Sequence, residues 1–278
     1  MADPRKLVVA LSGPSGVGKG RIIEALDLYA RLGWAPFRLN RLTRYTTRGV
    51  RSGEQDGVDY WYCYGDFLED SDQDRRRRRR AVAERYAEWS QRPLEGIEPL
   101  DDGQLLAYRV RSDTQAVYLP DILRAAEGPG IAFLDLNPSF FQAIRELVQQ
   151  QPWGPSLLFR SIYVTPLTSM EILRRAREHG LSWDEVIRAE MRRRLAERRA
   201  AGRSHEDEQE LEIRAAAAPD EMRLAFENPS RHDVLVVNPC GEGHPDWGTP
   251  HTLPVGSAAQ TVATVQRLIE TWARGTGA

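Results

Sequence analysis

Lysine is scarce in this sequence, and almost all of its positive charge comes from arginine. Lys6 and Lys19 are the only lysines among 38 basic residues, while 40 acidic residues bring the formal net charge to −2. A balanced charge does not favour bulk attraction to nucleic acid or to anionic membranes. Apolar runs long enough to span a membrane are also lacking, and MADPRK has no signal-peptide core. We therefore expect a cytoplasmic protein with neither a membrane nor a nucleic-acid partner.

Cysteine is as scarce as lysine. Cys63 and Cys240 lie far apart in the sequence and match no metal or redox spacing, so we interpret them as isolated thiols in a reducing compartment. His244 and His251 fall in residues 240–256, a stretch that contains glycine and proline but again no metal spacing. The sequence predicts a surface loop there and no metal site.

An apolar run that breaks into glycines is the strongest pattern that the sequence does contain. Residues 7–22 read LVVALSGPSGVGKGRI, which predicts a strand, a tight loop and a helix in that order. Glycines allow backbone N–H groups to turn inward, the helix N-terminus adds unpaired donors, and the ammonium of Lys19 can bridge phosphates. The spacing Gly13-x4-Gly18-Lys19 fits the P-loop rule. A Gly-rich turn that closes a hairpin is the alternative, but the residues that follow keep helical spacing.

One position departs from the P-loop pattern. Gly20 stands where the usual motif has the Ser or Thr whose hydroxyl holds Mg²⁺, so the ion would be held through water or by another group. The cradle does not depend on that hydroxyl, because its donors are backbone amides and Lys19. The residues that we assign to the donor phosphates are Gly13, Ser15, Gly16, Val17, Gly18, Lys19 and Gly20.

A second motif follows within residues 43–62, which read TRYTTRGVRSGEQDGVDYWY. Arg48 and Arg51 stand beside threonine hydroxyls and before a glycine-containing turn, a composition suited to a bidentate grip on an anion. A solvated polar hairpin is the alternative. The segment resembles the monophosphate-binding segment of guanylate kinases, TTR-x-x-R-x-GE-x-x-G-x-DY, and it lies at the expected distance behind a GPSG-x-GK loop. The resemblance covers about residues 7–238, with an insertion at about 71–103.

This resemblance implies ATP-dependent phosphoryl transfer, assisted by Mg²⁺, to a nucleoside monophosphate such as GMP, giving the diphosphate and ADP. It implies that Arg48, Arg51 and Tyr60 hold the acceptor phosphate. Arg44 replaces a family serine, which removes one acceptor contact or adds a positive charge. Asp135 ends an apolar predicted strand and matches the first acid of the family's Leu-Asp-Ile-Asp, so the resemblance places it at the acceptor and, through water, at Mg²⁺. A helix-capping acid is the alternative.

The turn with which guanylate kinases read guanine, Tyr-Tyr-Gly-Ser/Thr, has no counterpart here. The closest stretch, residues 105–115, reads LLAYRVRSDTQ and does not match, and Asn137 replaces the family's second acid. The acceptor therefore stays open between GMP, another nucleotide and a sugar phosphate such as ribose 1,5-bisphosphate. A non-catalytic guanylate-kinase-like binding module is the remaining alternative. Candidates for the missing contacts, among which the spacing does not select, are Glu95, Glu98, Ser112 and Asp113.

Residues 170–195 are similar to the lid of guanylate kinases, whose arginines close over the phosphates. Aligned without gaps, Arg175 matches the first lid arginine, whereas His179 and Glu190 stand at the second and third. We expect Arg175 and Arg177 to act with the P-loop lysine in catalysis, since phosphoryl transfer depends on positioning and on stabilising charge. A solvated pair of arginine-rich helices is the alternative. Neighbouring arginines that could add charge are Arg188, Arg192, Arg193 and Arg194.

Three other segments carry weaker signals. Arg75 to Arg80 form a run of six arginines within a helical pattern, which predicts a solvated helix with self-compensating charge, or else a phosphate or nucleic-acid contact. Residues 204–226 predict a charged helical stretch that breaks near Pro219. Asn238 ends the last predicted strand and matches the family's asparagine that contacts the donor adenine.

Together these elements predict an α/β fold: a P-loop NTPase-type parallel sheet flanked by helices, with an NMP-binding arm and a helical lid. We expect one kinase domain over residues 1–240, with the arm at about 43–104 and the lid at about 174–203. Residues 241–278 are expected to form a loop and a helix that pack on the same domain. The patterns do not predict the oligomeric state.

Overall fold

The computed structural model describes residues 6–50, 54–90, 97–101, 103–110, 113–202, 207–228, 232–249 and 251–276. The strands, in chain order, are β1 (Lys6–Ser12), β2 (Leu39–Arg41), β3 (Arg44–Thr46), β4 (Tyr60–Tyr62), β5 (Ile97–Leu100), β6 (Leu105–Val110), β7 (Asp113–Tyr118), β8 (Ile131–Asp135), β9 (Leu157–Thr165) and β10 (Val234–Val237). The α-helices are α1 (Lys19–Arg31), α2 (Gln73–Ser90), α3 (Leu119–Glu127), α4 (Pro138–Gln150), α5 (Ser169–His179), α6 (Trp183–Ala200), α7 (Glu208–Glu227) and α8 (Gly256–Thr276).

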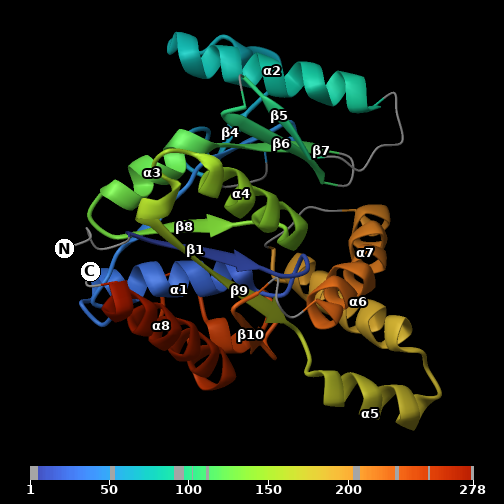
Figure 1. The fold of residues 1–278 in the computed structure, drawn as a ribbon. Helices are drawn as coiled ribbons and strands as arrows, with labels where there is room; N and C mark the ends of the chain where they lie inside the picture. The colour runs from blue at the N-terminus through green and yellow to red at the C-terminus, as the bar shows by residue number, and fades with distance from the viewer. Residues whose placement is uncertain are drawn as a thin grey trace.

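Five strands form a parallel sheet in the order β10-β9-β1-β8-β2, at the centre of the molecule (Figure 1). Side chains of β1 alternate between two cores: Val9 and Leu11 pack with α1 and α8, and Val8 and Ala10 pack with α3 and α4. Burial on both faces explains why these strands are almost wholly apolar. The predicted α/β fold with a parallel sheet flanked by helices is confirmed.

A second sheet forms the arm, in the order β4-β3-β7-β6-β5. It continues to Tyr118 at the end of β7, beyond the boundary expected for the arm, and α2 lies across it (Figure 1). The arginine run on α2 is not a solvated face, because Arg78 donates to the hydroxyl of Tyr45 (2.7 Å) and Arg79 is only 2% exposed. Arg79 donates to Asp56 (2.8 Å) and to the carbonyl of Tyr62 (2.8 Å). Part of the run therefore belongs to the core of the arm.

Helices α5, α6 and α7 pack around a third core. Thr168 and Ser182 form capping boxes that begin α5 and α6, and Gly180 ends α5 in the left-handed conformation at φ 65°. The break expected near Pro219 is not observed, since α7 continues through this residue. Pro219 is buried between apolar neighbours, and their packing against α6 compensates for the backbone hydrogen bond that proline cannot donate.

The segment after β10 is a surface loop only in its second part, where residues 248, 249 and 251–253 are exposed, whereas its first part packs into the core. Cys240 is 1% exposed and Trp247, in a short 3₁₀ turn, is 2% exposed, and both belong to the core beneath α1 and α8. The side chain of Asp246 accepts a hydrogen bond from the backbone N–H of Ser257 in the first turn of α8 (2.9 Å). Within the described ranges, every helix is too short or too polar to cross a bilayer.

Candidate active site

The glycine-rich loop between β1 and α1 has the predicted strand, loop and helix context. Gly13, Gly16 and Gly18 have φ values of 140°, 84° and 98°, which L side chains rarely adopt. A Cβ on Gly13 would collide with the carbonyl oxygen of Val164. The ammonium of Lys19 donates to the carbonyls of Gly13 (2.8 Å) and Pro14 (3.1 Å), so it curls back over the loop. These features form a concave nest of backbone N–H groups with one mobile cation.

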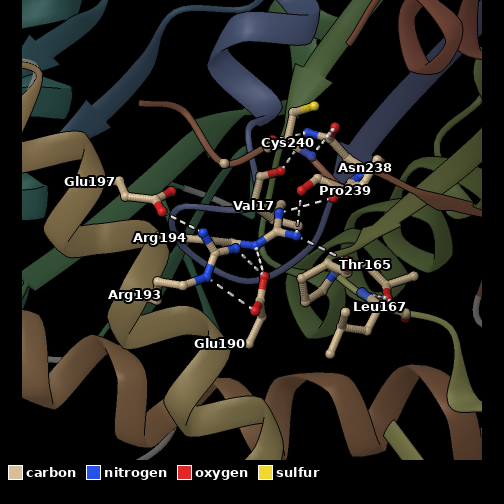
Figure 2. Close-up of polar contacts among 12 residues, drawn as sticks. Val17, Thr165, Leu167, Glu190, Arg193, Arg194, Glu197, Asn238, Pro239 and Cys240 are labelled. Atoms are coloured by element: carbon tan, nitrogen blue, oxygen red, sulfur yellow. Dashed lines mark hydrogen bonds and ion pairs between the residues drawn. The ribbon is translucent and has the colours of Figure 1, made fainter. Parts of the chain in front are cut away.

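The side chain of Asn238 supports this loop through hydrogen bonds to the backbone. Its side chain is fully buried, and its amide nitrogen donates to the carbonyls of Val17 (2.8 Å) and Cys240 (2.7 Å). Its amide oxygen accepts from the N–H of Cys240 (3.1 Å). Figure 2 shows these contacts beside the loop. Because both amide atoms are engaged within the protein, Asn238 supports the loop in this structure, and its contact with the donor adenine stays a prediction.

Glu190 lies at the third lid-arginine position and is 5% exposed. It accepts hydrogen bonds from Arg193 (2.7 Å) and from Nε of Arg194 (2.7 Å) (Figure 2). Burial acts to raise the pKa of Glu190, but hydrogen bonds and charges of these two arginines outweigh it and lower the pKa to about 2. Arg194 also donates to the carbonyls of Asn238 (2.9 Å) and Pro239 (3.0 Å). The pair thus fastens α6 to the strand end that supports the P-loop.

Arg175 and Arg177, the two lid arginines assigned to catalysis from the sequence, have no described contact with the P-loop. Arg175 is half-buried and pairs with Glu190 at 3.1 Å. Arg177 is exposed on α5, which projects away from the central sheet (Figure 1). Two of the other arginines considered for this role have acidic partners: Arg192 pairs with acidic residues of α7, and Arg193 pairs with Glu190. In this arrangement the lid residues stabilise the helical bundle, and their catalytic role stays a prediction.

Arg214 of α7 is the arginine that reaches the P-loop. It is 6% exposed, its Nη1 donates to the hydroxyl of Ser15 (3.0 Å), and it pairs with Glu210 one turn earlier. Ser15 belongs to the set assigned to the donor phosphates. No sequence signal identified Arg214, because it lies beyond the segment that resembles the lid and matches no motif.

Arg44 is the centre of the acceptor side. Its guanidinium donates to the hydroxyls of Tyr60 (2.8 Å) and Tyr108 (3.2 Å) and to the amide oxygen of Gln115 (3.0 Å). Burial acts to lower the pKa of Arg44, but Tyr60, Tyr108 and Asp135 outweigh it and raise the pKa. The side chain therefore stays charged at every physiological pH. The structure supports the view that Arg44 adds a positive charge where the family has a serine.

Tyr108 and Gln115 were missed, although both lie in the stretch that failed to match the guanine-reading turn. They face each other across the β6–β7 hairpin, and the hydroxyl of Tyr108 donates to Gln115 at 2.6 Å. The ring of Tyr108 stacks on Phe140 with centroids 3.5 Å apart. Two short apolar runs, residues 105–108 and 116–118, on either side of polar residues were a signal for this hairpin, and its pairing register would have brought Tyr108 and Gln115 together.

Arg48 lies on the other side of Tyr60. The centres of the Arg44 and Arg48 guanidinium groups are 5.0 and 4.9 Å from the ring centroid of Tyr60. Nη2 of Arg48 contacts both carboxylate oxygens of Glu54 (2.8 and 3.0 Å), and Tyr62 donates to the same carboxylate (2.8 Å). Arg44, Arg48 and Tyr60, three of the five predicted acceptor residues, therefore meet here. Arg51 lies outside the described residues.

Strand register brings the acceptor side next to the P-loop. Asp135, at the carboxyl end of β8, pairs with Leu11 of β1, two residues before Gly13. Its carboxylate is 3.8 Å from the guanidinium of Arg44. A pocket of about 50 Å³ lies at this point, between the arm, α1 and β8. Ligands of open α/β sheets bind beyond the carboxyl ends of the strands, which is where both clusters lie.

The fold and these two clusters define the chain as a P-loop protein of the type that joins an NMP-binding arm to a parallel sheet. The guanylate kinase of Aliivibrio fischeri is 28% identical to the chain over 186 residues, 65% of this chain and 69% of that protein. The guanylate kinase of Vibrio cholerae is 27% identical over 187 residues, with the same shares. The resemblance to guanylate kinases is thus confirmed over about two thirds of the chain.

Other comparisons are more limited in extent or in similarity. The guanylate kinase of Listeria monocytogenes is 40% identical over 70 residues, which span 25% of this chain and 32% of the relative's length. A solved guanylate kinase structure from Anaplasma phagocytophilum aligns with 97% of this chain and 87% of its own, at 13% identity and a TM-score of 0.44. No protein-family model matches the chain.

Proposed function

We propose that this protein transfers the terminal phosphoryl group of ATP to a nucleoside monophosphate of the GMP type, giving the diphosphate and ADP. The observation that carries the proposal is the register of β1 and β8, which sets the P-loop beside the Arg44 cluster. The terminal phosphate of ATP at the P-loop and the acceptor phosphate at the Arg44 cluster would then lie next to each other, in position for direct transfer. Transfer between two bound phosphates needs alignment and charge neutralisation, and it needs no protein nucleophile because the acceptor phosphate is already an anion.

On the donor side, the loop amides and Lys19 would hold the ATP phosphates. The ammonium of Lys19 donates to two loop carbonyls, and it would turn from them to the bound phosphates. Arg214 is placed to add positive charge beside Ser15. Arg175 and Arg177 remain the residues of the lid that we expect to approach when it closes.

On the acceptor side, Arg44, Arg48 and Tyr60 would hold the monophosphate. Arg48 is engaged by Glu54, so an incoming phosphate shares or replaces that partner. The present pocket, about 50 Å³, is far smaller than the roughly 300 Å³ at which ligand sites begin. Binding therefore requires the arm to shift from its described position, as lids and arms of kinases do.

ATP and Mg²⁺ are the expected cofactors. The nest of N–H groups fits a polyphosphate, whereas Gly20 offers the metal no hydroxyl and Arg21 turns away to the carbonyl of Trp247 (2.7 Å). Mg²⁺ commonly keeps several waters and binds through phosphates and one or two carboxylates. Phosphate oxygens and water, with Asp135 as the carboxylate assigned from the sequence, suit this chemistry. When bound, Mg²⁺ supplies charge neutralisation between the phosphates.

A coupled assay of ADP formation tests the proposal, with ATP and each of GMP, AMP, CMP, UMP and ribose 1,5-bisphosphate. We expect the highest kcat/KM with GMP. A preference for ribose 1,5-bisphosphate or another nucleotide would replace the acceptor in the proposal but leave the reaction class intact. No turnover with any acceptor, together with ATP binding that Lys19→Ala does not weaken, would favour the non-catalytic binding module instead.

A further inference from the structure

Three metal-binding side chains meet in the segment after β10. Cys240, His244 and Asp246 each present a ligand atom, and these atoms all lie within 4.8 Å of one another. The thiol of Cys240 is 3.7 Å from one carboxylate oxygen of Asp246, and Nδ1 of His244 is 3.6 Å from the other. The sequence spacing C-x3-H-x-D matched no familiar metal motif, yet the 3₁₀ turn at Pro245–Trp247 folds the three side chains onto one point.

The donor set is typical of one cation class. Thiolate, imidazole and carboxylate together suit a borderline divalent ion such as Zn²⁺, whereas Mg²⁺ and Ca²⁺ prefer oxygen ligands alone. Tetrahedral zinc, with ligands at 2.0 to 2.3 Å, places neighbouring ligand atoms about 3.3 to 3.7 Å apart. The distances from Nδ1 of His244 and from the thiol of Cys240 to the nearer oxygen of the Asp246 carboxylate, 3.6 and 3.7 Å, are close to this range.

The surroundings hold the three ligands in place. The backbone N–H of Cys240 donates to Asn238 (3.1 Å), and the indole of Trp247 donates to the carbonyl of Gly241 (3.0 Å). The N–H of Ser257 donates to one oxygen of Asp246 (2.9 Å), which is the kind of outer hydrogen bond that orients a ligating carboxylate. Cys240 is buried, while the side chains of His244 and Asp246 are 35% and 26% exposed. A cation could therefore enter from the solvent side.

Capping explains part of this arrangement but not all of it. Nδ1 of His244 accepts from the N–H of Asp246 (3.2 Å), a contact that an ion at Nδ1 would replace, and Asp246 accepts from the first turn of α8. Asn, Asp, Ser or Thr would perform either capping role equally well. Neither cap requires a buried thiol facing the same carboxylate. Zinc-class ions bind the thiolate form of cysteine, so an ion bound here would take the place of the Cys240 thiol proton.

We propose that Cys240, His244 and Asp246 form a binding site for one zinc-class divalent cation, with solvent at the fourth position. The site adjoins the support of the P-loop, since the carbonyl of Cys240 and that of Val17 share the amide of Asn238. A bound ion cross-links the ends of this turn and stabilises the folded chain as any ligand of the native state does. It is a structural site, separate from any Mg²⁺ that accompanies ATP.

The test uses the full chain, prepared without metal and then titrated with Zn²⁺ or Co²⁺ alone. We expect one ion per chain, a rise in thermal midpoint with Zn²⁺, and with Co²⁺ the absorption bands of a tetrahedral site that includes a thiolate. Cys240→Ala should abolish the thiolate band, and His244→Asn should weaken binding at least tenfold. Asparagine can still accept the hydrogen bond from Asp246, so His244→Asn keeps the cap and removes the imidazole.

Matched controls come from the other cysteine and from a neighbouring histidine. Cys63→Ala removes a buried thiol in the arm, and His251→Asn removes an exposed imidazole from the same segment. Both should bind the ion as the unaltered chain does. Absence of stoichiometric binding, or binding that survives both Cys240→Ala and His244→Asn, would overturn the proposal. If Cys240→Ala does not fold, His244→Asn decides alone, because His244 is partly exposed and its cap is preserved. Kinase activity enters none of these readouts.

Discussion

In the proposed reaction, the P-loop and the arm would bind the same chemical group by different means. In the P-loop, backbone amides and left-handed glycines form the nest, and a single cation, Lys19, completes it. In the arm, side chains from four strands converge: Arg44, Tyr60, Tyr108 and Gln115. The donor site is thus determined by one contiguous segment, whereas the acceptor site depends on strand pairing.

This difference predicts unequal tolerance to change. A nest of backbone N–H groups can bind any polyphosphate, because it recognises only negative charge and shape. The acceptor selectivity of the arm can be changed by substitution, because each side chain that faces Arg44 alters the charge and the hydrogen bonds offered to the acceptor. Four substitutions test these expectations, from the largest effect to the smallest.

Lys19→Ala should have the largest effect. Removing the only mobile cation of the nest should lower kcat by roughly 10³-fold, since neighbouring amides cannot follow the phosphoryl group. Lys6→Ala is the matched control, because it removes the other lysine at an exposed position at the start of β1. Steady-state kinetics of both variants would check this. Similar activity in Lys19→Ala and Lys6→Ala would contradict the assignment of the donor site.

Glu190→Gln should have the next largest effect, which is a loss of stability and not of catalysis. Removing the carboxylate leaves buried Arg194 without its ionic partner, which should cost about 3 kcal/mol in the free energy of unfolding. Glu178→Gln, which breaks an exposed pair with Arg174, should cost less than about 0.5 kcal/mol. Urea unfolding measures both. A loss in Glu190→Gln no larger than in Glu178→Gln would show that this pair does not fasten α6.

The pH dependence of stability has a defined sign. The pKa of Glu190 is lowered from 4.5 to about 2 by Arg193 and Arg194, so its contribution is fully present above pH 4.5 and is lost as the pH falls toward 2. The unaltered chain should therefore lose stability over this window more steeply than Glu190→Gln. Parallel slopes for the two proteins would contradict the pKa assignment.

Arg214→Ala should lower kcat by roughly 10- to 100-fold, the range for a lost hydrogen bond to a charged group. Arg214→Lys should restore part of the loss if its charge acts on the phosphates, whereas a purely structural role would lower stability in both variants without a selective effect on kcat. Arg192→Ala, which removes an exposed arginine of the same bundle, is the control. Kinetics with ATP as the varied substrate, beside thermal midpoints, would separate the two roles.

Gln115 provides the mildest and most selective test of the arm. Gln115→Glu places a carboxylate against Arg44 and should raise KM for the acceptor about tenfold, with KM for ATP unchanged. Gln115→Leu removes the same hydrogen bond without adding charge and should have a smaller effect. Equal effects of the two variants on acceptor KM would show that charge at Arg44 does not matter.

The features that could be predicted from the sequence are those that depend on residues close together in the chain. Glycine spacing and helical periodicity predicted the P-loop, and apolar strands separated by helices predicted the parallel sheet. Arg44, Arg48 and Tyr60 were found because the motif that contains them is also local. The arm boundary stayed inaccurate because β6 and β7 lack the family's turn and still join the same sheet.

The features that were not predicted depend on contacts between residues far apart in the sequence. Six consecutive arginines point to all sides of a helix, so the sequence alone did not show that Arg78 and Arg79 would be buried against aromatic and acidic partners. Arg214 reaches Ser15 across 199 residues, a distance that periodicity does not resolve. Asn238 was found at the expected strand end, but its burial beneath the P-loop depends on the packing of the segment after β10.

The near absence of lysine has a practical consequence for following the donor site. Amine-directed reagents can modify only Lys6, Lys19 and the N-terminal amine, since arginine does not acylate under mild conditions. Lys6 is exposed, whereas the ammonium of Lys19 contacts two carbonyls of the nest. Peptide mapping after brief acylation, with and without nucleotide, would make Lys19 a native reporter of occupancy that needs no engineered label.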